Sequence, residues 1–241
     1  HGVMNTDNMS ISGETIDYGP CAFMDYYDPE TVFSSIDYQG RYAFFNQPGI
    51  AKWNLARFAE CLIPLIDENK DKAIKMATEC IDNFANIYQK YWLEMMRKKL
   101  GLKGEEIKDE GLIIELLSCM HKNKADYTNT FCFLMNEKIL DDKIYNNQDF
   151  INWKKQWQER LKLHNNSKEK SLEIMRSVNP LVIPRNHIVE ETLNAANKDD
   201  LNPMLNLLEV LENPYQKQKT KNKYQSPGPI TDEKYQTFCG T

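Results

Sequence analysis

The chain has 241 residues, of which 41% are hydrophobic and 27% are charged, and its formal net charge at pH 7 is −5. This composition is that of a globular protein with a core of ordinary size, and the acidic balance excludes the basic footprint of a nucleic-acid-binding protein. The longest strongly apolar run, from Cys61 to Ile66, is far too short to span a membrane. We therefore expect a globular chain whose partners are neither nucleic acid nor membrane.

The first 20 residues, HGVMNTDNMSISGETIDYGP, predict a loop rather than a helix. In protein kinases the catalytic loop carries His-Arg-Asp, then four residues and Asn, and Asp-Phe-Gly follows a short hairpin. If His1 takes the place of that His, Val3 falls at the catalytic Asp and Asn8 at the Asn. Asp17 then opens an Asp-Tyr-Gly triplet, and two short strands are expected between about residues 9 and 18.

This spacing brings together oxygen ligands that suit a hard divalent cation. A carboxamide from Asn8 and a carboxylate from Asp17 are groups that Mg²⁺ prefers. Val3 cannot accept a proton, so Asp7 is the carboxylate left in the loop. On spacing alone, the same residues also fit ordinary turns.

Residues 21–46 have no sustained period and are rich in aromatic residues, Asp and Gly, which predicts an ordered but irregular loop. Arg41 and Lys52 flank the end of this loop, where they would contact a protein substrate or a phosphate, or simply face solvent. Trp53 lies off the main apolar face of the helix that follows. We therefore expect Trp53 to pack against the loop.

From Gln47 to Glu212 the apolar residues recur with the period of an α-helix. We predict Asp71, Asp126, Ser167 and Asn186 as helix N-caps. The fold class is therefore mainly α, with strand confined to the opening hairpin. The predicted helices cover residues 48–66, 71–100, 109–122, 127–139, 167–178, 187–196 and 200–212. A further helix is predicted to begin near residue 148 and to close within residues 161–166.

Beyond Asn213 the chain turns rich in Pro and Lys. We expect a tail that crosses the surface as an extended strip rather than as a helix. Its predicted tether points are the aromatic residues Tyr215, Tyr224, Tyr235 and Phe238.

The six cysteines show neither a CxxC pair nor a metal-ligand spacing. Four of them lie in helical apolar patterns and are predicted to be small buried thiols: Cys61, Cys80, Cys119 and Cys132. This usage favours a reducing compartment and therefore a cytoplasmic protein, of the bacterial type.

The opening string HGVMNTDNMSISGETIDYGPCAFMD closely resembles the signature of the selenoprotein O family. The resemblance continues through QPGIAKWNLARFAECLIPLI and NPLVIPRNHIVEETLNAA to the closing TFCGT, so it covers essentially the whole chain. Members of the family are kinase-like proteins that move AMP from ATP to protein hydroxyls, with pyrophosphate as the leaving group. The resemblance implies the α-rich C-lobe of such a fold over residues 1–213. That lobe comprises a catalytic loop and Asp-Tyr-Gly at 1–20, an activation-loop-like segment at 21–46 and a helical body at 47–213, followed by a tail at 214–241.

The resemblance also implies roles for three residues. Asp7 would accept the proton of a Ser, Thr or Tyr hydroxyl, while Asn8 and Asp17 would bind Mg²⁺ or Mn²⁺. Asp17 would also lie against the phosphates of ATP through the metal. The family's Gly-rich loop and phosphate-gripping residues precede the position of His1, so we expect a fragment that binds Mg·ATP poorly and is inactive alone.

Three other interpretations stay open at this point. The protein could transfer the γ-phosphoryl group instead, or be a catalytically dead scaffold that binds nucleotide or protein. It could also act through redox chemistry at Cys239, because selenocysteine occupies a matching near-terminal place in some family members. In that case a disulfide between Cys21 and Cys239 would restrict the catalytic loop.

Overall fold

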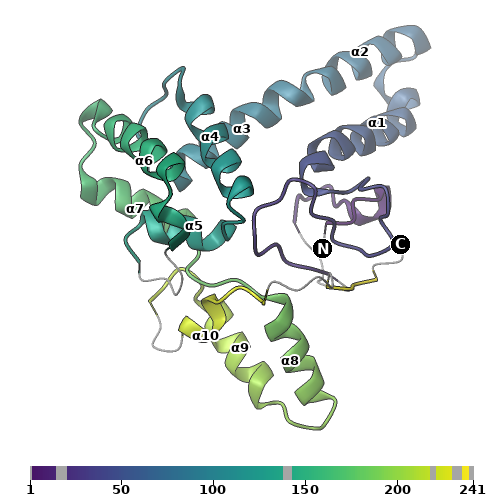
Figure 1. The fold of residues 1–241 in the computed structure, drawn as a ribbon. Coiled ribbons are helices and arrows are strands. Elements are labelled where there is room, and N and C mark those ends of the chain that lie inside the picture. Colours follow the sequence, from purple (N-terminus) through teal and green to yellow (C-terminus); the bar gives the residue numbers. More distant parts are fainter. Residues whose placement is uncertain (1, 15–20, 138–142, 218–220, 230–234, 239–241) are drawn as a thin grey trace. The chain divides into compact units, whose positions relative to one another are not determined.

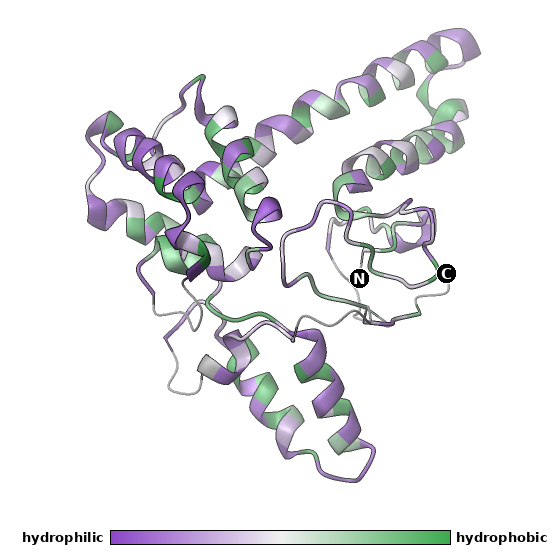
Figure 2. Cartoon of the chain, in the orientation of Figure 1, coloured by the Kyte–Doolittle hydropathy of each residue, from purple (hydrophilic) through white to green (hydrophobic). Residues whose placement is uncertain are grey.

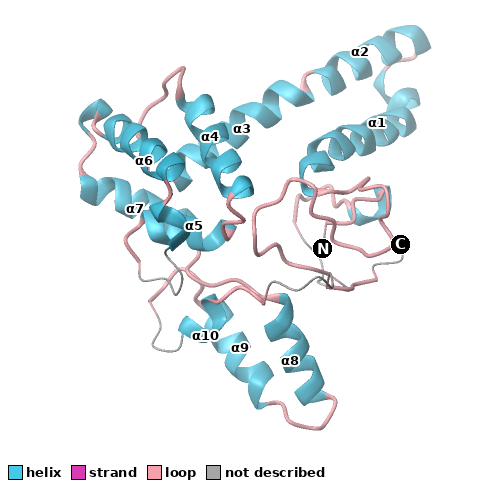
Figure 3. Cartoon of the chain, viewed as in Figure 1, coloured by secondary structure: helices cyan, strands magenta, loops and turns pink. Residues whose placement is uncertain are grey.

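The structure, a computed structural model, describes residues 2–14, 21–137, 143–217, 221–229 and 235–238 (Figure 1). Helices make up nearly all the regular structure of these residues, as Figure 3 shows, and the prediction of a mainly α fold is confirmed. The α-helices are α1 (Gln47–Ile66), α2 (Lys70–Asp82), α3 (Phe84–Lys99), α4 (Asp109–Lys122), α5 (Tyr127–Leu134), α6 (Gln148–Leu161), α7 (Lys168–Val178), α8 (Asn186–Ala196), α9 (Asn202–Glu212) and α10 (Lys221–Gln225). Short 3-10 turns are η1 (Thr6–Asn8), η2 (Phe44–Asn46), η3 (Lys143–Asn146) and η4 (Leu163–Asn165).

The chain divides into two compact units. Unit 1 comprises residues 1–22, 29–92 and 234–241, and unit 2 comprises residues 23–28 and 93–233. The division falls within α3. Unit 1 therefore holds the opening loop and the α1–α2 pair, and unit 2 holds α4 to α10.

The opening hairpin is only partly within the described residues. Residues 9–14 form a turn closed by a hydrogen bond from Gly13 N to Ser10 O at 3.1 Å, without a strand. Residues 15–18, the other half of the predicted hairpin, lie outside the described part of the chain. Across the residues that are described, β pairing is recorded as an isolated bridge between Tyr26 and Asp126.

The predicted single helix over residues 71–100 is wrong, because the chain forms two helices there, α2 and α3. They meet at Asn83, which caps α2 through its N–H to Glu79 O at 3.3 Å. An Asn side chain competes with the backbone for hydrogen bonds, which makes it a weak helix former. Gly101, just beyond α3, has a positive φ of 68°, which suits the end of a helix.

Two of the four predicted N-caps are confirmed. Asp126 accepts from Asn129 N at 2.7 Å, and Ser167 accepts from Lys170 N at 3.3 Å. For α2 the cap is Asn69 rather than Asp71, because α2 begins at Lys70 and Asn69 Oδ1 accepts from Lys72 N at 3.0 Å.

Helix α5 is shorter than predicted and ends at Leu134. Two residues further on, Asn136 adopts a left-handed conformation with φ 60°. Asn tolerates this conformation better than most residues do, so it ends the helix as a glycine would.

The core of unit 2 forms around two buried tryptophans of α6. Trp153 Nε1 donates to Leu112 O at 2.8 Å, and Trp157 Nε1 donates to Leu100 O at 2.9 Å, so α6 is fixed to both α4 and the end of α3. Their rings stack on each other with centroids 6.0 Å apart. A buried indole needs such a partner for its N–H.

One buried carboxylate in this core is paired with two arginines. Asp109, fully buried at the start of α4, accepts from Arg160 Nε at 2.6 Å and from Arg97 Nε at 2.7 Å. Burial alone would raise the pKa of Asp109, but hydrogen bonds from Arg160, Glu106 N–H and Arg97 hold it below its ordinary value.

A second buried ionic cluster in unit 2 fixes the short segment 23–28. Arg185, 1% exposed, donates through Nη1 to Asp25 Oδ1 and to Asp126 Oδ2, each at 2.6 Å. Asn186 donates to and accepts from the backbone of Phe23, at 2.9 and 2.8 Å. The predicted N-cap role of Asn186 is therefore wrong, since its side chain is committed to this segment and Arg185 is the capping residue of α8.

The tail departs from the predicted extended strip. Residues 221–225 form the short helix α10, and Tyr224 is buried with Val182, Ile188, Leu207 and Val210 against α8 and α9. Apolar contact with these two helices outweighs the weak helical period of the tail. Of the other predicted tether points, Tyr215, Tyr235 and Phe238 are exposed.

The prediction of four buried thiols is half right. Cys119 and Cys132 are buried in unit 2, whereas Cys61 and Cys80 are exposed on α1 and α2. Figure 2 shows apolar and polar residues mixed along these two helices, which pack on each other. None of the helices among the described residues has the length and apolar character needed to cross a membrane.

Candidate functional site

The candidate catalytic loop is built around a buried valine. Val3, which takes the place of the kinase aspartate, is only 4% exposed, and its carbonyl oxygen accepts from Asn8 Nδ2 at 3.0 Å. Asn8 is the last residue of the turn η1, which is closed by Asn8 N donating to Asn5 O at 3.0 Å. Asp7 sits on this turn with its side chain exposed to solvent. The loop therefore turns Val3 inward and Asp7 outward.

Two side chains from the rest of unit 1 support this loop. Asn54, the buried polar residue of α1, donates through Nδ2 to Met4 O at 2.9 Å. The hydroxyl of Tyr42 donates to Asn5 Oδ1. These contacts hold the two residues that directly precede η1. Neither residue was predicted from the sequence, since an Asn within an amphipathic helix gives no sign of what it binds.

Gly2 is required by the close approach of the loop to a phenylalanine. It has a positive φ of 74°, and a Cβ atom there would lie 2.3 Å from Phe33 Cδ2. Any larger residue would therefore have to displace the Phe33 ring and adopt a disfavoured backbone conformation.

The residues with the right chemistry for a divalent cation are Asn8 and Asp17. Because the amide nitrogen of Asn8 donates to Val3 O, its orientation is set and Oδ1 is the atom that could serve as a metal ligand. Asp17 lies outside the described residues. In the part of the chain that the structure describes, no group of three or more His, Cys, Asp or Glu side chains could hold a metal ion. The Asn8–Asp17 pair stays a prediction.

The prediction that Trp53 packs against the irregular loop is confirmed. The guanidinium of Arg41, from the loop, lies 5.0 Å from the centroid of the Trp53 ring. Arg57, one turn further along α1, lies 5.3 Å from the same ring. Lys52, for which a position facing solvent was the other expectation, is partly exposed and pairs with Asp82 of α2 at 3.1 Å.

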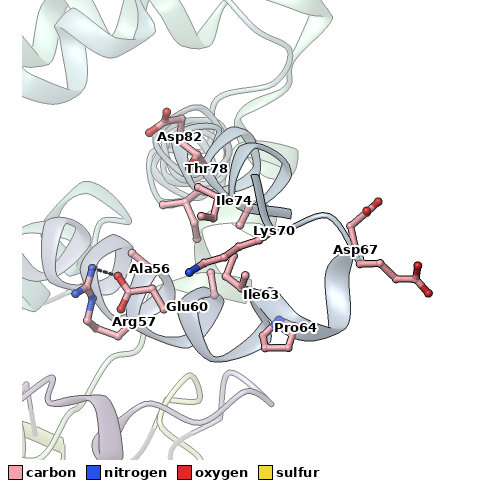
Figure 4. A pocket seen from close by; sticks show the side chains of 14 residues that line it. Ala56, Arg57, Glu60, Ile63, Pro64, Asp67, Lys70, Ile74, Thr78 and Asp82 are labelled. Carbon is pink, nitrogen blue, oxygen red and sulfur yellow. Dashed lines mark ion pairs between the residues drawn. The ribbon is translucent and has the colours of Figure 1, made fainter. Parts of the chain in front are cut away.

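A groove of about 940 Å³ lies between α1 and α2, as Figure 4 shows. Its walls are apolar at Ile63, Pro64 and Ile74, and the ion pair between Arg57 and Glu60 lies at its edge. The groove has none of the predicted site residues in its lining. It is therefore a feature separate from the candidate catalytic loop.

The structure does not test the predicted pairing of the two redox cysteines. Cys21 is half-buried, and Cys239 lies outside the part of the chain described. Their disulfide stays a prediction.

Comparison with known proteins identifies the family. Residues 1–212 match the family described as protein adenylyltransferase SelO. The whole chain is 61% identical to the protein nucleotidyltransferase YdiU of Pelagibacter ubique, covering 50% of that relative. It is 54% identical to the protein of the same name in Clostridium perfringens and 56% identical to that in Clostridium botulinum, covering all of this chain and 49% of each relative.

The chain therefore belongs to the SelO family of protein adenylyltransferases, and the resemblance seen in its opening residues is confirmed. It spans about half the length of the curated relatives that it matches.

Proposed function

We propose that this chain forms part of a protein adenylyltransferase, which transfers AMP from ATP to Ser, Thr or Tyr hydroxyls of other proteins. The proposal rests on family membership and on one observation in the loop: Val3 is buried and Asp7 is exposed. The kinase position for the catalytic base is thus filled by a core residue. A carboxylate four residues later faces solvent in its place.

In the proposed reaction the acceptor hydroxyl oxygen attacks the α-phosphorus of ATP. The bond between the α-phosphorus and the oxygen bridging to the β-phosphorus breaks, and pyrophosphate leaves with that bonding pair. Asp7 accepts the hydroxyl proton, as a general base does when it lies within hydrogen-bond reach of the nucleophile. AMP thereby becomes esterified to the protein.

Neighbouring residues hold the backbone before Asp7 in one arrangement. The Asn8 amide, oriented by Val3 O, and the Asp17 carboxylate would hold Mg²⁺ or Mn²⁺. When bound, the cation neutralises phosphate charge, which is the main source of catalysis in transfers of this kind. Asn54 and Tyr42 keep the backbone before η1 in place, so they act as positioning residues.

We further propose that residues 1–213 correspond to the C-lobe of a kinase-like fold. The residues that grip the nucleotide phosphates from the other lobe would lie in the half of the relatives that this chain does not cover. On that basis the 241-residue chain alone should bind Mg·ATP poorly and show no turnover.

The decisive experiment uses a chain of the relatives' length and ATP labelled separately at the α- and γ-phosphates. Label on protein from the α-phosphate alone supports adenylyl transfer. Label from the γ-phosphate alone would identify a kinase, and no label from either would identify a nucleotide- or protein-binding scaffold.

Two matched variants test the role of Asp7. We expect Asp7→Asn to reduce α-label transfer by about 100-fold or more, the range in which a general base contributes. Glu14→Gln removes another exposed carboxylate from the same loop and should leave transfer within about twofold. Equal rates for Asp7→Asn and the unaltered chain would show that the base lies elsewhere.

A further inference from the structure

A cluster of cationic and aromatic side chains lies beside the candidate catalytic loop. We define the Arg41–Trp53 platform as Arg41, Tyr42, Trp53 and Arg57. Both guanidinium groups lie over the Trp53 ring, at 5.0 and 5.3 Å, and Arg41 also lies 5.7 Å from the Tyr42 ring. Trp53 remains 44% exposed, so this indole is a surface feature rather than part of the core.

The conformation of Arg41 is set by its own turn. Asp37 accepts from the backbone N–H groups of Arg41 and Tyr42, at 2.8 and 2.9 Å, and Gly40 gives the turn its positive φ of 63°. The Asp37 carboxylate is thus bound to the main chain and not to the guanidinium. Stacking on Trp53 then limits the motion of the Arg41 side chain.

Arg41 brings uncompensated positive charge to this surface. Arg57 is neutralised by Glu60 at 2.7 Å, but within the described residues no ion pair is formed by the exposed Arg41. A guanidinium stacked on an aromatic ring keeps its N–H groups at the ring's edge available to a carboxylate. The platform therefore favours an anionic partner.

The platform is joined directly to the loop that holds Asp7. Tyr42, next to Arg41, donates its hydroxyl to Asn5, and Asn54, next to Trp53, donates to Met4 O. All these residues belong to unit 1. A protein that presents a hydroxyl to Asp7 would thus meet the platform with residues close to that hydroxyl.

We propose that the Arg41–Trp53 platform binds an acidic side chain near the acceptor hydroxyl of the protein substrate. This inference rests on the proposed adenylyl transfer and adds a substrate preference to it. An exposed Trp with Arg and Tyr neighbours is the composition of a protein-binding hot spot. A nucleotide, by contrast, is normally enclosed in a pocket, and this exposed platform faces solvent.

The test uses a chain of the relatives' length and two synthetic peptides, each with one Tyr acceptor. One peptide carries Glu residues on both sides of the Tyr, and the other carries Gln at the same places. Binding is measured by fluorescence anisotropy without ATP, and KM and kcat are measured with α-labelled ATP. The variants are Arg41→Gln, Arg41→Glu and the control Lys75→Gln, which removes an exposed cation from α2 of the same unit.

We expect Arg41→Gln to weaken binding of the Glu peptide by about 3- to 10-fold and to raise its KM equally, with kcat unchanged. This range is that of one partly exposed charge pair. Arg41→Glu should weaken binding further, while the Gln peptide and the Lys75→Gln control should change by less than twofold.

Three results would overturn the platform proposal. They are equal losses for the two peptides, a loss as large in Lys75→Gln, and a raised KM for ATP in place of the peptide, which would assign Arg41 to the nucleotide phosphates. Selective binding of the Glu peptide without any α-label transfer would support the platform while refuting adenylyl transfer. Transfer of the α-label without a preference for the Glu peptide would support adenylyl transfer while refuting the platform proposal.

Discussion

The buried cluster around Arg185 offers the sharpest test of how unit 2 is held together. Replacing Arg185 by Met keeps much of the side-chain volume but removes four donated hydrogen bonds, two to carboxylate oxygens at 2.6 Å, one to Asp126 Oδ1 at 3.3 Å and one to Gln225 O at 3.0 Å. Asp25 and Asp126 then face each other without a cation. Breaking a buried ion pair by removing one partner costs about 3–5 kcal/mol, and we expect this loss in the free energy of unfolding of Arg185→Met.

Part of that loss should be recoverable. Burial raises the pKa of the Asp126 carboxyl above its ordinary value, and the Arg185 guanidinium acts against that rise. Without Arg185 the ionised carboxylate is left uncompensated. Adding Asp126→Asn removes the charge yet keeps an N-cap for α5, since Asn caps helices as well as Asp does. We expect a coupling of about 1–3 kcal/mol between the two substitutions.

Urea unfolding followed by tryptophan fluorescence measures the free energy of unfolding. Hydrogen exchange shows which segment of the chain has lost stability. Exchange should accelerate at Phe23, Tyr27 and Tyr127, whose N–H groups hold the segment 23–28 in place. The control is Arg160→Met, which also removes four donated hydrogen bonds from a buried guanidinium but does not touch this segment. A loss below about 1 kcal/mol for Arg185→Met, or equal exchange in the two variants, would refute the reasoning.

Three further predictions concern single residues. Burial lowers the pKa of Lys99 to about 8. Below pH 8 Lys99 is charged in the folded state, and its burial lowers the free energy of unfolding. This loss becomes smaller as the pH rises from 8 to the unfolded pKa near 10.5, where Lys99 is neutral in both states. Lys99→Met should be the more stable chain at pH 7, by up to about 3 kcal/mol, and this gap should close by about pH 10.5 in urea titrations. Gly2→Ala should displace Phe33 and lower α-label transfer by 10-fold or more; unchanged transfer would show that the loop can move aside. Asn54→Leu leaves Met4 O without its donor and should cost about 1–3 kcal/mol, and a thermal midpoint equal to that of the unaltered chain would contradict this role.

Helix positions were predictable because they depend on a local property of the sequence. The apolar period locates all nine helices from α1 to α9 to within a few residues, apart from the break at Asn83 and the early end of α5. Both errors occur at Asn residues. The short Asn side chain competes for backbone hydrogen bonds and weakens a helix without always ending it, so the sequence alone does not show which Asn interrupts a helix. The short helix α10 was missed because its stability comes from the burial of Tyr224 against distant helices and not from its own period.

Long-range polar contacts could not be predicted in the same way. Asp25 and Arg185 are 160 residues apart in the sequence, and Asn54 and Met4 are 50 apart. A charged or amide residue in an amphipathic pattern indicates an exposed position, and only the fold shows that a partner lies opposite it. The same reason explains the two exposed cysteines: an apolar pattern shows which face could be buried, but not whether another element covers it.

The candidate site combines both kinds of information. The spacing of the kinase motif aligns Val3, Asp7 and Asn8 with the catalytic loop. Spacing alone does not decide whether Val3 replaces a lost catalytic base or whether the match arose by chance. The structure adds that this side chain is in the core and that its carbonyl orients the Asn8 amide. A carboxylate at position 3 would have to be buried there, at a cost of several kcal/mol unless it were paired. The backbone at Val3 thus orients Asn8, the candidate metal ligand, and places the side chain of position 3 in the core, where a catalytic base is disfavoured. The exposed turn at Asp7 is the place in this loop where a carboxylate can act as that base.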